Sequence, residues 1–253
     1  MKRSPSIATK IYPAAAFSVL IIIWELIVWL NNVPEYRLPA PSAILSEFVN
    51  SFGLLMYHAA TTVVEALIGF VLGVALSVFF AVAMSMVKPI KLMFYPFMIV
   101  SQTIPLVVIA PLLAIWFGFG IVPKIIMSVV VVFFPVTVSL TEGLGTCDED
   151  LVDLMKVMKA SKRQIYRTVL IPNALPSFFA GMKISAAYCI MGAVISEWTG
   201  ASRGLGIYLS RAMSTFKTAA LFSNIAVIIL LSLILFKIVD LIEKKVIPWN
   251  KID

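Results

Sequence analysis

Long apolar runs alternate with short polar gaps along most of this chain. A helix that crosses a bilayer needs about 20 predominantly apolar residues. Six segments come close to this length and composition: 11–30, 59–87, 92–117, 121–140, 177–198 and 219–241. The pattern therefore predicts an all-α fold, a polytopic membrane protein with six transmembrane helices.

The gaps between these runs complete the predicted organisation. Ser42 is expected to cap a short helix over 42–57, a segment too polar to cross a membrane. The predicted parts are a cytoplasmic N-terminus at 1–10, a first transmembrane helix at 11–30, an external loop with a short helix at 31–58, a transmembrane domain at 59–241 that includes a polar loop at 142–176, and a cytoplasmic C-terminus at 242–253.

Composition agrees with a membrane protein and excludes several other classes. Hydrophobic residues make up 61% of the 253 residues, against roughly 45–50% in a soluble domain, and the mean hydropathy is +1.01. The net charge of +7 lies in the gaps between apolar runs, so it does not indicate a nucleic-acid partner. One histidine and two cysteines predict neither a metal site nor a disulfide.

The distribution of basic residues predicts the orientation. With the N-terminus in the cytoplasm, 15 of the 20 Lys and Arg residues lie on the cytoplasmic side. The reversed orientation would place them outside, against the positive-inside rule. Both termini and the loop at 142–176 are therefore predicted to be cytoplasmic.

The loop at 142–176 is the longest polar interval of the chain. In it, Leu151, Leu154, Met155 and Met158 recur at helical spacing and predict an amphipathic helix over 151–163. A second helical run is expected from Lys162 to Leu170, with a stop at Pro172. Such a helix lies on the membrane surface, packs on its own protein or docks into a soluble partner.

Five polar or helix-breaking positions within the apolar runs are candidates for the translocation pathway. Glu65 and Glu197 lie in the outer third of their runs, as Glu25 does, and either contact solute or reach headgroups and nearby arginines. Gln102 and Thr103 stand beside Pro105 in the middle of the third run. Proline frees backbone carbonyls that a cavity can satisfy, although interhelical hydrogen bonding explains the two polar side chains equally well.

Several segments resemble the permeases of ABC importers. Their cytoplasmic loop is written EAA, three residues, G, nine residues, I, one residue, LP. The spacing is matched here by Asp153-Leu154-Met155, Lys159, Val169, Ile171 and Pro172. Lys159 stands where the family has a glycine that marks a turn, so it must either continue the helix or adopt a less favourable turn conformation.

Further segments are similar to the nitrate, sulfonate and taurine type of these permeases. They are Ile104-Pro105 to Gly118-Phe119-Gly120, Pro172-Asn173-Ala174-Leu175-Pro176 followed by Gly181, and Glu197 with Gly204-Leu205-Gly206. The resemblance covers roughly residues 55 to 245.

The resemblance implies a type I ABC importer transmembrane domain in a bacterial inner membrane. Two permease copies would form the pathway, an extracytoplasmic binding protein would deliver the solute, and separate ATPase subunits would each accept one loop helix. The implied coupling residues are Leu151, Asp153, Leu154, Met155, Met158, Lys159, Lys162 and Arg163. No catalytic residue or cofactor is expected in this chain, which lacks the phosphate-binding pattern GxxxxGK[ST].

The solute and one other class of transporter stay open. Relatives of this type carry nitrate, sulfonates, taurine, or thiamine and flavin precursors, and the lack of mid-run Lys or Arg favours a neutral or aromatic solute. An ion-coupled secondary transporter would show inverted repeats and buried ionisable pairs at mid-membrane. Neither is evident in the sequence.

Overall fold

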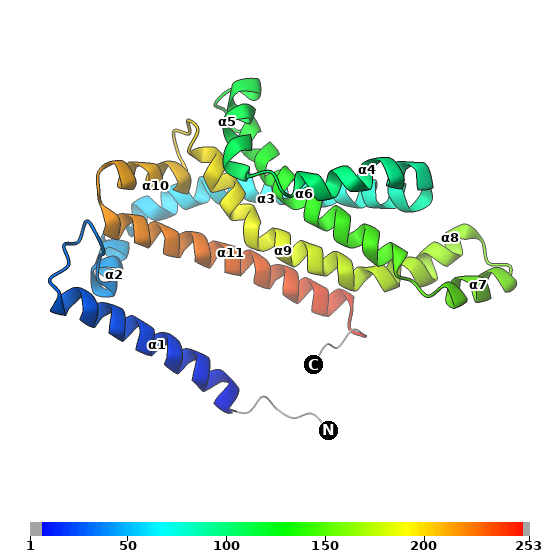
Figure 1. Cartoon of the computed structure of the whole chain (residues 1–253), viewed down its shortest axis with the longest axis horizontal. Helices are drawn as coiled ribbons and strands as arrows, with labels where there is room; N and C mark the ends of the chain where they lie inside the picture. The colour runs from blue at the N-terminus through cyan, green and yellow to red at the C-terminus, as the bar shows by residue number, and fades with distance from the viewer. Residues whose placement is uncertain (1–6, 250–253) are drawn as a thin grey trace. The chain divides into compact units, whose positions relative to one another are not determined.

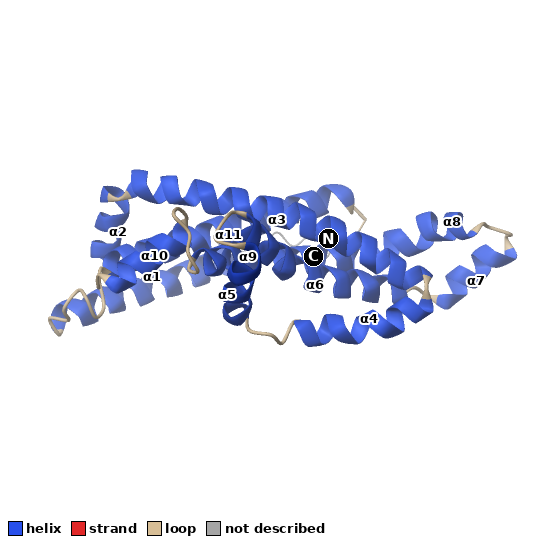
Figure 2. Cartoon of the chain, turned by 90° about the horizontal axis from the view of Figure 1, so that it is seen from above, coloured by secondary structure: helices blue, strands red, loops and turns tan. Residues whose placement is uncertain are grey.

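The computed structural model describes residues 7–249, and within them every regular element is a helix (Figures 1 and 2). The elements are α1 (Ile7–Leu30), α2 (Pro41–Asn50), α3 (Phe52–Met86), α4 (Lys88–Ser101), α5 (Leu106–Phe117), α6 (Val122–Gly145), α7 (Glu149–Val157), α8 (Lys162–Ile165), η1 (Tyr166–Leu170, a π-helical turn), α9 (Ile171–Glu197), α10 (Leu205–Ser214) and α11 (Thr218–Val246). Lys2, Arg3 and Lys251, which entered the charge count, lie outside the described residues.

The described residues form two compact units. The first, here called the N-terminal unit, contains the chain up to Tyr57 together with Tyr208–Val227. The second, here called the main unit, contains His58–Ile207 and the chain from Ile228 onward.

Four uninterrupted helical stretches are long and apolar enough to cross a membrane: Phe52–Met86, Val122–Gly145, Lys162–Glu197 and Thr218–Val246. A fifth crossing results if α4 and α5 count as one broken span, since they are bent by 106° across a short break. Helix α1 contains a shorter apolar stretch, Ala15–Leu30. All six predicted segments fall on these helices, so the all-α membrane fold is confirmed, while the number of crossings remains a prediction.

Small residues let α3 pack tightly against α6 in the main unit. Gly69 and Gly73 are four residues apart on α3, a spacing that allows helix backbones to approach closely in membranes. A Cβ atom at Gly73 would lie 2.8 Å from the Val132 Cβ and 3.1 Å from the Val129 carbonyl oxygen. One turn further along, the buried Ser77 donates a hydrogen bond to the carbonyl of Phe133. The contact between α3 and α6 is not among the sequence predictions, although the four-residue spacing of Gly69 and Gly73 is a signal for it.

Glycines also allow close packing between α6 and α9, which run side by side (Figure 1). A Cβ at Gly143 would approach the Ser177 Cβ to 2.7 Å, and one at Gly181 would approach the Ser139 Cβ to 2.8 Å. Because the hydrophobic effect does not drive association between helices in lipid, close backbone approach supplies much of the attraction. Helices α3, α6 and α9 therefore form a tightly packed scaffold.

In the N-terminal unit, a carboxylate from α1 caps α2. The backbone N–H of Ser42 donates to Glu25 over 3.1 Å, and the Ser42 hydroxyl donates to the same carboxylate over 2.7 Å. The expectation that Ser42 itself is the N-cap is wrong, because the helix begins one residue earlier, at Pro41, and Ala40 is the N-cap. The expectation that it extends to residue 57 is also wrong, because α2 ends at Asn50. Glu25 thus satisfies a free N–H group at the positive end of a helix.

We expect replacement of Gly73 by Leu to separate α3 from α6. Forcing a large side chain into so close a contact should cost about 1–3 kcal/mol and lower the Tm by roughly 3–10 °C. The measurement is thermal unfolding of the purified protein in detergent. Gly53→Leu on the same helix is the matched control, because nothing lies within 4 Å of a Cβ at that position. Equal Tm values for the two variants would contradict the packing described for Gly73.

Candidate functional site

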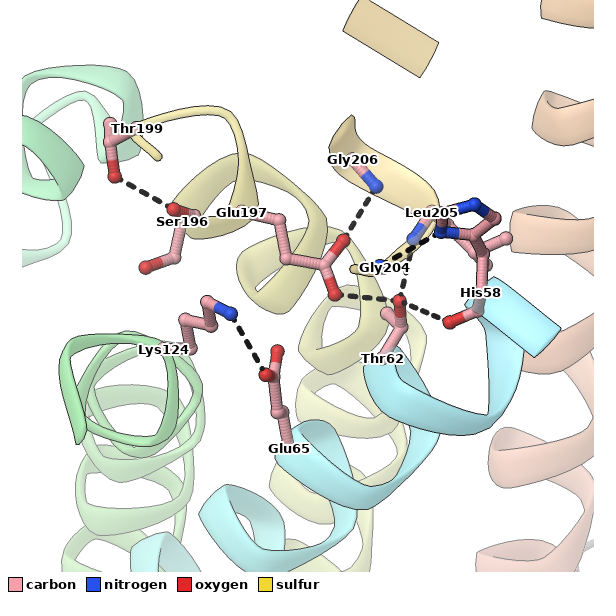
Figure 3. A network of polar contacts seen from close by, with 10 residues as sticks. All are labelled: His58, Thr62, Glu65, Lys124, Ser196, Glu197, Thr199, Gly204, Leu205 and Gly206. Atoms are coloured by element: carbon pink, nitrogen blue, oxygen red, sulfur yellow. Dashed lines mark hydrogen bonds and ion pairs between the residues drawn. The ribbon is translucent and has the colours of Figure 1, made fainter. Parts of the chain in front are cut away.

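A buried polar network surrounds the start of α10 in the main unit (Figure 3). Three consecutive backbone N–H groups each meet a side chain. The N–H of Gly204 donates to His58 Nδ1 over 3.1 Å, and that of Leu205 donates to Thr62 Oγ1 over 2.9 Å. The N–H of Gly206 donates to Glu197 Oε2, and the Thr62 hydroxyl donates to Glu197 Oε1 over 2.7 Å. Side chains from α3 and the end of α9 therefore cap α10.

The local backbone explains why glycines stand at two of these positions. Gly204 has a φ of +128°, a conformation that residues with a Cβ rarely adopt. A Cβ on Gly204 would overlap the Glu197 carboxylate, and one on Gly206 would overlap the Val194 carbonyl oxygen. The first N–H groups of a helix have no partner within the helix, so a carboxylate fits here by hydrogen bonding and by the helix dipole.

Glu65 forms a buried ion pair beside this network. Its Oε1 lies 3.1 Å from Lys124 Nζ, and the two side chains are 2% and 10% exposed. Lys124 lies in the first turn of α6 and is one of the five basic residues that the predicted orientation places outside. The pair was missed because the two partners are 59 positions apart.

The alternative that Glu65 and Glu197 reach lipid headgroups is wrong for this structure. Glu65 is 1% exposed and Glu197 is 0% exposed. Both carboxylates instead have protein partners: Lys124 pairs with Glu65, and Thr62 and the N–H of Gly206 donate to Glu197. Their predicted contact with a solute stays a prediction.

The break between α4 and α5 lies at the predicted place. Helix α4 ends at Ser101 and α5 begins at Leu106, directly after Pro105. Of the three predicted pathway residues here, only Gln102 lines a cavity of about 320 Å³. Thr103 donates instead to the Val100 carbonyl over 2.7 Å, and Pro105 serves as the N-cap of α5. The short loop that joins α4 to α5 is visible in Figure 2.

The polar loop at 142–176 contains two helices separated by a turn. Helix α7 ends at Val157 and α8 begins at Lys162, so the predicted single helix over 151–163 is wrong. The predicted stop at Pro172 is also wrong. Pro172 comes directly after the π-helical turn η1, and the helical run that begins at Lys162 continues past it to Glu197. Proline and π-helical turns both interrupt the regular α-helical hydrogen bonding, and here they stand side by side without ending the helix.

Lys159 forms the turn between these helices. Its φ is +59°, and its N–H donates to the Lys156 carbonyl while that of Ala160 donates to Met155. These two bonds form a Schellman motif, in which the left-handed position is usually glycine. The less favourable turn conformation is thus the one adopted, at a cost of roughly 1–2 kcal/mol.

The predicted coupling residues are brought together on this loop, at one end of the main unit (Figures 1 and 2). Leu151, Leu154 and Met158 are 49%, 56% and 70% exposed, whereas Met155 is half-buried. Asp153 pairs with Lys156 over 2.8 Å. Lys162 and Arg163 form the first turn of α8, after a capping box between Ser161 and Gln164. Lys159 is exposed in the turn between the two helices.

Within residues 7–249, no three or more His, Cys, Asp or Glu side chains lie together in a way that could hold a metal ion.

Apolar spanning helices, a broken span beside a cavity and an exposed helical loop together define a polytopic transport protein. The sequence profile of the family described as binding-protein-dependent transport system inner membrane component matches residues 69–248. The chain belongs to this family, which comprises the inner-membrane permeases of ABC importers.

Individual relatives agree with this assignment. The chain is 33% identical to a probable ABC transporter permease of Haemophilus influenzae, over 90% of this chain and 93% of the relative. It is 32% identical to a formylaminopyrimidine transport permease of Halalkalibacterium halodurans, over 99% of both. Its fold is similar to that of an amino acid ABC transporter, with a TM-score of 0.64, 19% identity and coverage of 80% and 98%. These relatives give no support to an ion-coupled secondary transporter.

We expect Lys124→Met to destabilise the protein by roughly 3–5 kcal/mol, because it leaves Glu65 as an uncompensated buried charge. The double variant Glu65→Gln with Lys124→Met should recover most of this loss, since neither buried charge remains. Thermal unfolding in detergent measures both. Lys237→Met, which removes an exposed partner of Asp240, is the control and should change the Tm little. A double variant no more stable than Lys124→Met would argue against the ion pair.

Proposed function

We propose that two copies of this chain form the pathway of an ATP-driven importer and that α7 of each copy docks into a separate ATPase subunit. An extracytoplasmic binding protein delivers the solute on the opposite side. Both termini and the α7–α8 loop face the cytoplasm, as the distribution of Lys and Arg requires.

The exposed apolar face of α7 is the observation that supports docking. Leu151, Leu154 and Met158 stay largely exposed although they are apolar and lie on a short helix at the end of the main unit. An amphipathic helix that presents such a face commonly binds in a hydrophobic groove of a partner. Methionine suits this contact because its side chain adapts to an irregular surface.

The charge of α7 favours a protein groove over the membrane surface. Helices that lie on membranes carry Lys and Arg on their polar face, which attracts anionic lipids. Helix α7 instead carries Glu149, Asp150 and Asp153 against the single basic residue Lys156. Lys162 and Arg163 follow on α8, where they can pair with acidic groups at the rim of the groove and set its orientation.

The solute is inferred to be a small organic molecule of the thiamine-precursor type. One relative that matches 99% of this chain is named as a formylaminopyrimidine transport permease. In this chain, no Lys or Arg lies near the middle of a predicted span, where a nitrate or sulfonate would need a counter-charge. We therefore favour this solute class over the anionic solutes of the wider family.

We expect Leu154→Asp combined with Met158→Asp to abolish docking. Two charges on the apolar face cannot be buried in a groove without a large desolvation cost. Co-purification of the ATPase subunit with the permease should be lost, while the Tm of the permease alone should hardly change because both side chains are exposed. Lys156→Ala, on the polar face of the same helix, is the control. Normal ATPase recovery with the double aspartate variant would refute docking through α7.

We expect Cys147 to react with a membrane-impermeant maleimide only from the cytoplasmic side. Cys147 lies between α6 and α7, and Cys189 is buried, so labelling reports the position of the loop. Burial, and then the nearby Asp148 carboxylate, raise the pKa of the Cys147 thiol. Because the thiolate is the reactive form, labelling should accelerate as the pH rises from 7 to 9.

Inside-out and right-side-out vesicles, compared by mass spectrometry, measure this reaction. Cys147→Ser is the control and should remove the label. Labelling in right-side-out vesicles would place the loop outside and overturn the proposed orientation.

A further inference from the structure

The cavity beside the α4–α5 break lies entirely within the main unit. It has a volume of about 320 Å³ and is walled by α6 and α9 in addition to the two halves of the broken span. Pockets for small molecules typically have volumes of roughly 300–1,000 Å³ and combine an apolar lining with a few polar groups. This cavity is thus large enough for a solute with a single ring.

The lining of the cavity is uncharged. Its polar side chains are Ser101, Gln102, Ser139 and Tyr188, and all other lining residues are apolar. Moving an ionised group out of water without a partner charge is strongly unfavourable. The cavity therefore disfavours a sulfonate, a nitrate or a free amine and suits an uncharged solute.

Several hydrogen-bonding groups in the wall are free to meet such a solute. Among the described residues, the hydroxyls of Ser139 and Tyr188 have no hydrogen-bond partner. Gln102 donates from Nε2 to the Met98 carbonyl over 3.3 Å, while its amide oxygen accepts no bond from a described residue. Pro135 lacks an N–H, so it cannot donate the usual α-helical hydrogen bond to the carbonyl of Val131. Both residues line the cavity.

Two rings complete the site. Phe134 on α6 and Tyr188 on α9 both line the cavity, and aromatic side chains stack favourably on flat rings. The uncharged cavity wall thus combines hydrogen-bond donors and acceptors with two aromatic rings. This combination matches a heteroaromatic solute that carries amino and carbonyl or hydroxyl groups.

We propose that this cavity is a solute-contact subsite for an uncharged heteroaromatic molecule of about pyrimidine size, in which Gln102 and Tyr188 determine specificity. The proposal rests on the proposed importer function and adds the place and chemistry of recognition within this chain. A second occupant, a side chain of the other permease copy, is the alternative that the experiment must separate.

The experiment uses the complete importer in proteoliposomes, with permease, ATPase and binding protein together. The probes are radiolabelled formylaminopyrimidine, as the uncharged heteroaromatic ring, and radiolabelled taurine, as the sulfonate. ATP-dependent uptake of the pyrimidine but not of taurine is expected. Gln102→Glu places a charge in the cavity and Val138→Trp fills it, so each should lower pyrimidine uptake at least about tenfold, the loss of roughly one or two good contacts.

ATPase co-purification is measured on the same samples, to establish that each variant folds and assembles with its ATPase subunit. Tyr188→Phe keeps the ring and removes only the hydroxyl, so it should impair uptake less than Tyr188→Leu. Ile229→Trp, at a position on α11 that is 54% exposed and does not line the cavity, is the size-matched control and should transport normally.

Three results would overturn the subsite. They are uptake of taurine in place of the pyrimidine, normal pyrimidine uptake by Gln102→Glu and Val138→Trp, and loss of cross-linking between two permease copies in Val138→Trp. The last result would assign the cavity to an interface between copies. Failure of the importer function itself would show earlier and separately, as absence of ATPase co-purification with the wild-type chain.

Discussion

Every buried backbone N–H and C=O group needs a hydrogen-bond partner, and the first N–H groups of a helix find none within the helix itself. The start of α10 shows how this chain meets that requirement. His58, Thr62 and Glu197 supply one acceptor each to the three N–H groups of Gly204, Leu205 and Gly206. In the N-terminal unit, Glu25 serves the start of α2 in the same way. The acidic residues of the apolar segments are thus explained first as caps and pair partners.

Within the main unit, close packing of α3, α6 and α9 holds Thr62, Glu197 and the broken span in place. Glycines where these helices cross bring their backbones close together. A small shift of one helix against another would therefore cause direct steric contact. The helical run from Lys162 to Glu197 then joins the α7–α8 loop to the scaffold without interruption. Its π-helical turn contains Tyr166, whose hydroxyl is hydrogen-bonded to Ser85 on α3 over 2.7 Å. A force on the loop would therefore reach two scaffold helices.

Sequence reasoning succeeded where a signal is local. Apolar runs placed the long helices, and Pro105 marked the break because proline cannot donate a helix hydrogen bond. It failed where two local rules compete. Pro172 predicts a stop, yet the helix continues past it because a π-helical turn directly precedes it. The 151–163 helix was overextended because Lys159 adopts a conformation that sequence patterns assign to glycine.

The all-α membrane fold, the family and the presence of a long polar loop at 142–176 could be predicted from the amino-acid sequence, because hydrophobic length and motif spacing are properties of the linear chain. The orientation in the membrane stays a prediction from the basic residues. Only the tertiary structure decided which polar residues meet. The pairing of Glu65 with Lys124, the capping role of Glu197 and the cavity beside Gln102 join positions far apart in the chain. Such contacts depend on how helices pack, and no local pattern encodes that packing.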